Sequence, residues 1–190
     1  MSGGIAQLVA VGAQDAHIVG NPEVSFFRST YKRHTNFAQT VEKQVIQGNP
    51  ATNGMSTVRF ERKGDMLGHV YITNRSPVNS TRVQWKDQIK KVELLIGGQV
   101  IDTQTSEFSQ EIVPVMLSQT YSKSLAAAAA DKSAVYPLRF SFCENAQSAL
   151  PLIALQYHDV EIRISWNAVS ATDYEVHAQF VYLDTDERTA

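Results

Sequence analysis

The side chains that most often carry catalysis or hold metals are few in this chain and poorly spaced for either task. Its five histidines lie at positions 17, 34, 69, 158 and 177. They form no His-x-x-x-His or Glu-x-x-His pair, so the sequence predicts no zinc site. His158 precedes Asp159, but adjacent residues of a strand point to opposite faces, which argues against a base oriented by its neighbour. We expect no catalytic residue, no cofactor and no metal, and hence no enzyme.

Cys143 is the only cysteine, so the chain can form no internal disulfide, as is typical of proteins from a reducing compartment. A cysteine nucleophile needs a nearby histidine, and a sequence alone does not show which residues are near Cys143. We expect Cys143 to act as a small buried hydrophobe. The Gly97-Gly98 pair is not followed by a helix N-terminus, so it predicts a turn and no phosphate cradle.

Two charged groups are candidates for subunit contacts. The only basic cluster is too small for nucleic-acid binding in a chain of net charge −2, and no direct nucleic-acid partner is expected. Near residue 190 lies a charged tail that could pair with the basic cluster of a neighbouring subunit. The alternative is a solvated terminus, because exposed ion pairs contribute only about 0–1 kcal/mol each. The residues are Arg28, Lys32 and Arg33 in the cluster, and Asp184, Asp186, Glu187 and Arg188 in the tail.

Two N-glycosylation triplets begin at Asn74 and Asn79. Pro77 follows the first, and the N-terminus lacks the charged and then apolar layout of a secretory signal. No apolar stretch approaches the roughly 20 residues that span a bilayer. We therefore expect a soluble intracellular product without membrane insertion, in which neither asparagine is glycosylated.

The elements that must position these groups are mostly strands. Residues 1–22 predict an N-terminal arm of small and apolar residues, and residues 23–190 predict one domain. One helix is expected from Ser106 to Tyr121, interrupted at Pro114, and a second, shorter one in the alanine run 125–130. Loops are expected at 48–54 and 74–81, and a tight Gly-Gly hairpin turn at 97–98. Alternating or apolar segments predict about eight strands, within 24–31, 37–46, 55–62, 67–73, 89–102, 136–142, 159–166 and 174–183.

Many short strands with little helix predict an all-β, two-sheet antiparallel sandwich or barrel. Periodicity alone leaves the jelly roll and other Greek-key sandwiches open. Six segments decide between them, because they resemble, in order, the capsid jelly-roll proteins of nucleocytoplasmic large DNA viruses. They are Gly4–Asp15, Gly20–Phe27, Tyr31–Phe37, Val92–Asp102, Ala149–Asp159 and Tyr182–Arg188.

This resemblance implies a single eight-stranded jelly roll with an N-terminal arm. Major capsid proteins of the group continue into a second jelly roll after a segment like 183–188, whereas this sequence stops at Ala190. We therefore expect a complete penton protein that forms homopentamers at the fivefold vertices of an icosahedral virion. Its expected partners are itself, neighbouring major capsid protein capsomers and minor capsid proteins, assembled in the host cytoplasm above an internal viral membrane.

Two other interpretations remain. The chain could be the N-terminal jelly roll of a double-barrelled major capsid protein, which forms trimeric capsomers. It could also be a carbohydrate-binding jelly roll for host attachment, although its loops hold few aromatic residues. A metal-binding barrel enzyme of the cupin type would need clustered histidines that the sequence lacks.

Overall fold

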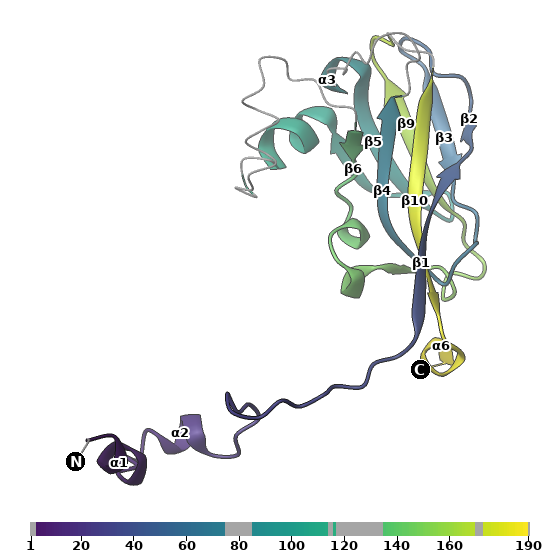
Figure 1. The fold of residues 1–190 in the computed structure, drawn as a ribbon. Helices are drawn as coiled ribbons and strands as arrows, with labels where there is room; N and C mark the ends of the chain where they lie inside the picture. The colour runs from purple at the N-terminus through teal and green to yellow at the C-terminus, as the bar shows by residue number, and fades with distance from the viewer. Residues whose placement is uncertain (1–2, 75–84, 114–115, 117–134, 170–172, 190) are drawn as a thin grey trace. The chain divides into compact units, whose positions relative to one another are not determined.

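The computed structural model describes residues 3–74, 85–113, 116, 135–169 and 173–189 of the 190-residue chain (Figure 1). The chain forms two compact units, Met1–Thr35 and Asn36–Ala190. The sequence-based division placed the boundary after residue 22, whereas the first unit continues to Thr35. No helix among the described residues is both long enough and apolar enough to cross a bilayer.

The first unit contains two short helices, α1 (Gly3–Val9) and α2 (Ala16–Val19). Each of its described residues is exposed. The expected strand over 24–31 is wrong, because this segment holds a turn and no strand. Phe26 and Phe27 are 94% and 96% exposed. A β-prone sequence becomes a strand only where a partner strand and a covered face are available, and this segment has neither.

The second unit is a sandwich of two antiparallel sheets of five strands each (Figure 1). One sheet has the order β1-β10-β4-β7, with β8 also paired to β4, and the other has the order β2-β3-β9-β5-β6. The strands are β1 (Phe37–Gln44), β2 (Ile46–Gln47), β3 (Met55–Arg59), β4 (Met66–Asn74), β5 (Ile89–Ile96), β6 (Gln99–Thr105), β7 (Val135–Pro137), β8 (Leu150–Pro151), β9 (Val160–Trp166) and β10 (Tyr174–Leu183). β2 and β8 have two residues each, and the other eight strands are longer. Seven of the eight expected segments contain strands, and one of them, 89–102, contains two, β5 and β6.

The core lies between the sheets and is built from alternate residues of the strands. In β9, Val160, Ile162 and Ile164 are at most 3% exposed, while Glu161 and Arg163 between them are only partly buried. β10 alternates in the same way from Tyr174 to Phe180. Burying one such large apolar side chain contributes about 1.5–3 kcal/mol, so the alternation expected from the sequence also fixes the pairing register.

Two hydrogen bonds connect Trp166, the last residue of β9, to the β2–β3 loop through Ser56. The indole N–H of Trp166 donates to Ser56 Oγ at 2.8 Å. The Ser56 hydroxyl in turn donates to the Gly48 carbonyl at 2.9 Å. A buried indole N–H needs such an acceptor, so Ser56 satisfies both the tryptophan and the loop.

The Gly-Gly hairpin is confirmed between β5 and β6. Gly97 and Gly98 have φ angles of +60° and +80°, as a two-residue primed turn requires. A Cβ on Gly97 would approach His158 Nδ1 to 2.7 Å, so this glycine is needed for space as well as for its φ angle.

One expected strand is shorter than the pattern indicated. The strand over 136–142 ends at Pro137, because proline cannot donate to the ladder, and a 3-10 turn, η2 (Ser141–Cys143), follows. A second such turn, η3 (Ala146–Ser148), precedes β8.

The helix expected from Ser106 contains the π-helical segment η1 (Phe108–Ile112), and a one-turn helix, α3 (Trp85–Gln88), precedes β5. Pro114, the run 125–130 and the loop residues beyond Asn74 lie outside the described residues.

Candidate assembly surfaces

The histidines and acidic residues of the barrel do not gather into a metal site. Among the described residues, no three His, Cys, Asp or Glu side chains lie close enough to hold an ion. The Asp159 carboxylate accepts a hydrogen bond from Arg59 Nη2 at 2.6 Å, across the β3–β9 edge. The Asp159 carboxylate thus has a structural partner in Arg59. A catalytic role in which Asp159 orients His158 as a base is not needed to explain it.

Cys143 is buried, as expected, with 5% of its surface exposed. Burial raises the pKa of its thiol from 9.0 to about 11, because the thiolate would lose its solvation. The group therefore stays protonated near neutral pH. A protonated thiol is neither a nucleophile nor a metal ligand.

The charged tail folds into a short helix, α6 (Thr185–Thr189), at the end of β10. Arg188 Nη2 donates to Asp65 Oδ2 at 3.1 Å and to the Leu183 carbonyl at 3.3 Å. Asp65 Oδ2 also accepts the Leu183 N–H at 2.8 Å. Arg188, which the sequence placed among possible subunit contacts, is thus bound to its own barrel.

The other members of the two charged groups are exposed. Asp184 Oδ1 accepts the Thr185 N–H at 2.8 Å and begins α6. In the part of the chain that the structure describes, no ion pair involves the remaining two carboxylates of the tail or the three cations of the basic cluster. These residues are Asp186 and Glu187 in α6, and Arg28, Lys32 and Arg33 in the first unit. Both groups face solvent, and their contact between subunits stays a prediction.

The edge strand β1 exposes more apolar surface than the other strands of its sheet. Phe37 is 62% and Val41 53% exposed, and Val45, just beyond the strand, is 68% exposed. Among the described strands, β1 pairs only with β10, so one of its edges carries no described partner. Exposed edges with apolar side chains are typical of surfaces that bind another chain.

Polar and aromatic side chains cover the outer face of this sheet next to β1. Glu175 pairs with Lys43 at 2.7 Å and with His177 at 3.3 Å. His177 stacks on Tyr71, with ring centroids 5.2 Å apart and an interplanar angle of 19°. This network links side chains of three neighbouring strands, β1, β10 and β4.

A groove of about 410 Å³ lies near the end of β3. One wall is held by Arg62, which donates to the carbonyls of Gln156 (2.7 Å), His158 (3.0 Å) and Leu155. The guanidinium therefore supports the loop before β9. The lining residues are Val45, Gln47, Arg59, Phe60, Glu61, Arg62 and Asp159.

Of the two glycosylation triplets, only the first asparagine falls within the described residues. Asn74 ends β4, and both its side-chain nitrogen and oxygen are shielded from solvent. A glycan-transfer enzyme needs access to that nitrogen, so we expect Asn74 to stay unmodified. Asn79 lies outside the described residues.

Sequence reasoning missed three features of these surfaces: the Asp65 anchor, the Arg62 contacts and the exposed apolar side of β1. The anchor joins residues 118 and 123 positions apart, so no local pattern marks it. Of the three features, only the exposure of β1 left a signal. Its alternation was weaker than that of β9, since only Phe37, Val41 and Val45 are apolar among the five alternate residues of one side.

The sequence comparisons point to one group of proteins. Residues 25–185 match the family described as the major capsid protein N-terminus. The chain is 35% identical over 217 residues to the major capsid protein of Pyramimonas orientalis virus, covering 99% of this chain and 55% of that protein. It is 31% identical over 217 residues to the major capsid protein of Paramecium bursaria Chlorella virus 1, covering 100% and 50%. The chain thus spans about half the length of these curated relatives.

Solved structures agree with the sequence. The quasi-atomic model of the PBCV-1 virus capsid superposes with a TM-score of 0.72 at 25% identity, over 87% of this chain and 47% of that one. The Faustovirus major capsid protein superposes with a TM-score of 0.60 at 9% identity, over 94% and 59%, which supports the fold alone. The expected jelly roll is confirmed. This chain belongs to the family of major capsid protein N-terminal jelly rolls, whose relatives come from large DNA viruses.

Proposed function

We propose that this chain is a structural subunit of the virion, acting as the N-terminal jelly roll of a major capsid protein that forms trimeric capsomers. The observation that carries this proposal is the match of residues 25–185 to the major capsid protein N-terminus, in relatives about twice as long. A shell subunit needs extended contact surfaces and no active site. The exposed apolar side of β1 and the outer face beside it suit that role.

The partners in this proposal are other capsid subunits, and the place of action is the virion. Copies of the same chain, neighbouring capsomers and minor capsid proteins would contact the exposed charged groups and β1. The basic cluster would meet protein rather than nucleic acid, because three cations release few counterions. Assembly in the host cytoplasm is part of the same proposal.

A penton that forms homopentamers at the vertices is the second candidate. The observation in its favour is the compact β2–β3 loop. This loop is closed by hydrogen bonds from the Asn53 N–H to the Asn167 carbonyl at 3.0 Å and from the Gly54 N–H to the Ala51 carbonyl at 2.8 Å. The relatives named above are major capsid proteins, which makes the capsomer the stronger proposal.

Native mass spectrometry of the purified capsid protein, combined with a reconstruction of the virion, separates the two. The capsomer proposal expects a polypeptide of about twice this length, in trimers on the facets. A chain of this length in pentamers at the fivefold vertices would replace it with the penton. Absence of the chain from purified virions would overturn both.

A further inference from the structure

The first unit carries a large apolar surface that its own described residues do not bury. Each described residue from Gly3 to Thr35 is exposed. Monomeric proteins seldom leave so many large apolar side chains in water along one segment. The exposed fractions are Ile5 66%, Leu8 80%, Val9 76%, Val11 62%, Ile18 84%, Val19 58%, Val24 76%, Phe26 94%, Phe27 96% and Tyr31 94%.

This surface is large enough for a stable interface. Phe26, Phe27 and Tyr31 would each remove about 150 Å² or more from solvent on burial. Seven aliphatic side chains add to that, so one arm reaches the roughly 800 Å² per partner of a specific protein interface. Residues 3–27 hold only two ionised groups, Asp15 and Glu23, both acidic. With the three cations of the basic cluster, residues 3–35 carry a net charge of only +1, which is too low for strong binding to nucleic acid or anionic lipid, so we expect the apolar part to bind an apolar protein surface.

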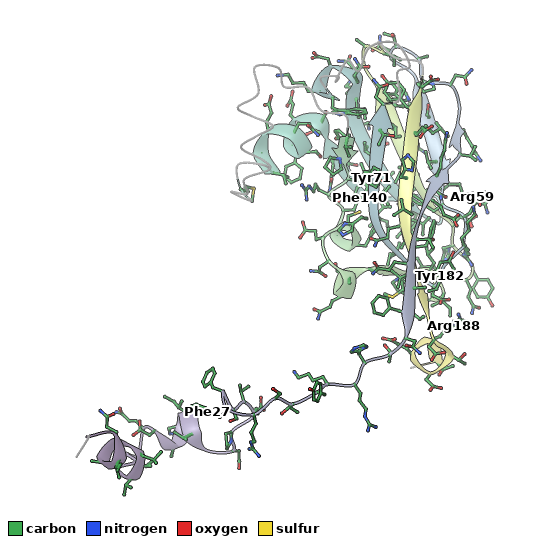
Figure 2. The ribbon with its side chains drawn as sticks, viewed as in Figure 1. Phe27, Arg59, Tyr71, Phe140, Tyr182 and Arg188 are labelled. Carbon is green, nitrogen blue, oxygen red and sulfur yellow. The ribbon has the colours of Figure 1, made fainter. Side chains whose placement is uncertain are left out.

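The barrel offers such a surface at the end where β1 begins. Phe37 pairs with Leu183, so the start of β1 lies beside the end of β10 and next to α6. Figure 2 shows Tyr182 and Arg188 at this end of the barrel. From this end the exposed apolar residues run along β1, from Phe37 to Val41, with Val45 just past its far end. Arg62, which lines the groove, is three residues before Asp65, which anchors α6, so this short segment connects the groove to α6.

The arm and the barrel end at α6 carry opposite charges, and every copy of the chain has both. In the arm, the apolar part is followed by the basic cluster. At the barrel end, α6 presents acidic side chains while Arg188 is turned to Asp65. A partner that carries both the basic arm and the acidic acceptor is a second copy of this same chain.

We propose that residues 3–35 dock on the barrel of a second copy, with the apolar part on the exposed apolar side of β1 and the basic cluster beside α6. The proposal rests on the proposed function, since a shell places many copies side by side. Each copy gives one arm and receives another, so the arms are either exchanged within a pair or passed head-to-tail around a closed ring.

Charge reversal in two separate chains tests whether the arm docks on a second copy or on its own barrel. One variant carries Arg28→Glu, Lys32→Glu and Arg33→Glu, and the other carries Asp184→Lys, Asp186→Lys and Glu187→Lys. Sedimentation of the full chain in about 0.1 M salt should show self-association weakened about tenfold in each variant alone. A mixture of the two should recover association fully in pairs or even-membered rings and only partly in a trimer or pentamer, where one contact stays mismatched. Rescue by both changes in one chain, without rescue on mixing, would overturn exchange between copies.

The apolar part is tested by Phe26→Ser with Phe27→Ser, which should weaken association about a hundredfold. The matched control is Val100→Ser with Ile101→Ser on β6, which are 48% and 58% exposed and lie outside the proposed contact. Equal loss in both pairs would show a nonspecific apolar effect and overturn the docking. Binding of the unchanged chain to phosphatidylcholine vesicles, lost with the Phe26 and Phe27 changes, would assign the arm to a membrane instead.

The outcomes also separate this inference from the proposed function. If the charge-reversed and serine variants still form the oligomer found in virions, arm docking fails while the capsid role stands. If the unchanged chain is absent from virions yet exchanges arms, the capsid role fails while the docking stands.

Discussion

Loss of Asp65 should release α6 from the barrel at a predictable cost. The side chain is 14% exposed, and its Oδ2 accepts the Leu183 N–H at 2.8 Å and Arg188 Nη2 at 3.1 Å. Asp65→Ala leaves that amide without its charged acceptor, and a hydrogen bond of this kind contributes about 1.5–3 kcal/mol. The ion pair adds less than about 1 kcal/mol, because the Arg188 side chain is 44% exposed. The expected loss in the free energy of unfolding is about 2–3 kcal/mol.

Urea denaturation measures this loss directly. With an m-value of about 2 kcal/mol/M, the midpoint of Asp65→Ala should fall by about 1 M at unchanged m. Arg188→Ala is the matched control, because it removes the ion pair and keeps the bond to the Leu183 amide. Its midpoint should fall by no more than about 0.5 M. Equal losses in the two variants would refute the assignment of the larger share to the backbone hydrogen bond.

Three further predictions concern the core. Ser56→Ala should lower stability by about 1–3 kcal/mol in thermal unfolding, because the buried Trp166 indole loses its acceptor; an unchanged melting temperature would contradict this. Gly64→Ala should cost about 1–3 kcal/mol in equilibrium unfolding, since a Cβ there would lie 2.8 Å from Phe180 Cβ; a neutral result would mean that the strand yields. Folding raises the pKa of Cys143 from 9.0 to about 11, so the unfolded thiol ionises first and stability should fall as pH rises from about 9 to 11. Cys143→Ala should flatten that slope in a pH series of urea midpoints, and an identical slope would exclude the thiol as its cause.

The sequence predicted those strands best whose two faces differ in environment. β9 lies between β3 and β5, and its inner residues Ile162 and Ile164 are fully buried while Arg163 reaches solvent, so the local pattern matches the burial. The segment 24–31 holds three aromatic residues, against one in β9, yet it forms no strand. A strand requires hydrogen-bonding partners that a local pattern does not encode, which is why these two segments had different outcomes.

The surfaces were less predictable than the fold because they depend on contacts between distant residues. Both charged groups were recognised from composition, but Asp65 reaches Arg188 across 123 positions of the chain, and this contact removes Arg188 from the tail's exposed charges. The choice between vertex and facet depended on the length of the polypeptide, which no pattern of strands encodes. Relatives of about twice the length now favour the facet.

The pairing of Phe37 with Leu183 has a consequence for how such a barrel can be reused. The polypeptide enters and leaves the sandwich through adjacent strands of one sheet, so the path through the barrel is nearly closed (Figure 1). A domain with neighbouring ends can be duplicated in tandem or circularly permuted without rerouting a strand through its core. A short linker from residue 184 to residue 36, with new ends in the 48–54 loop, should therefore give a permuted barrel with the same two sheets.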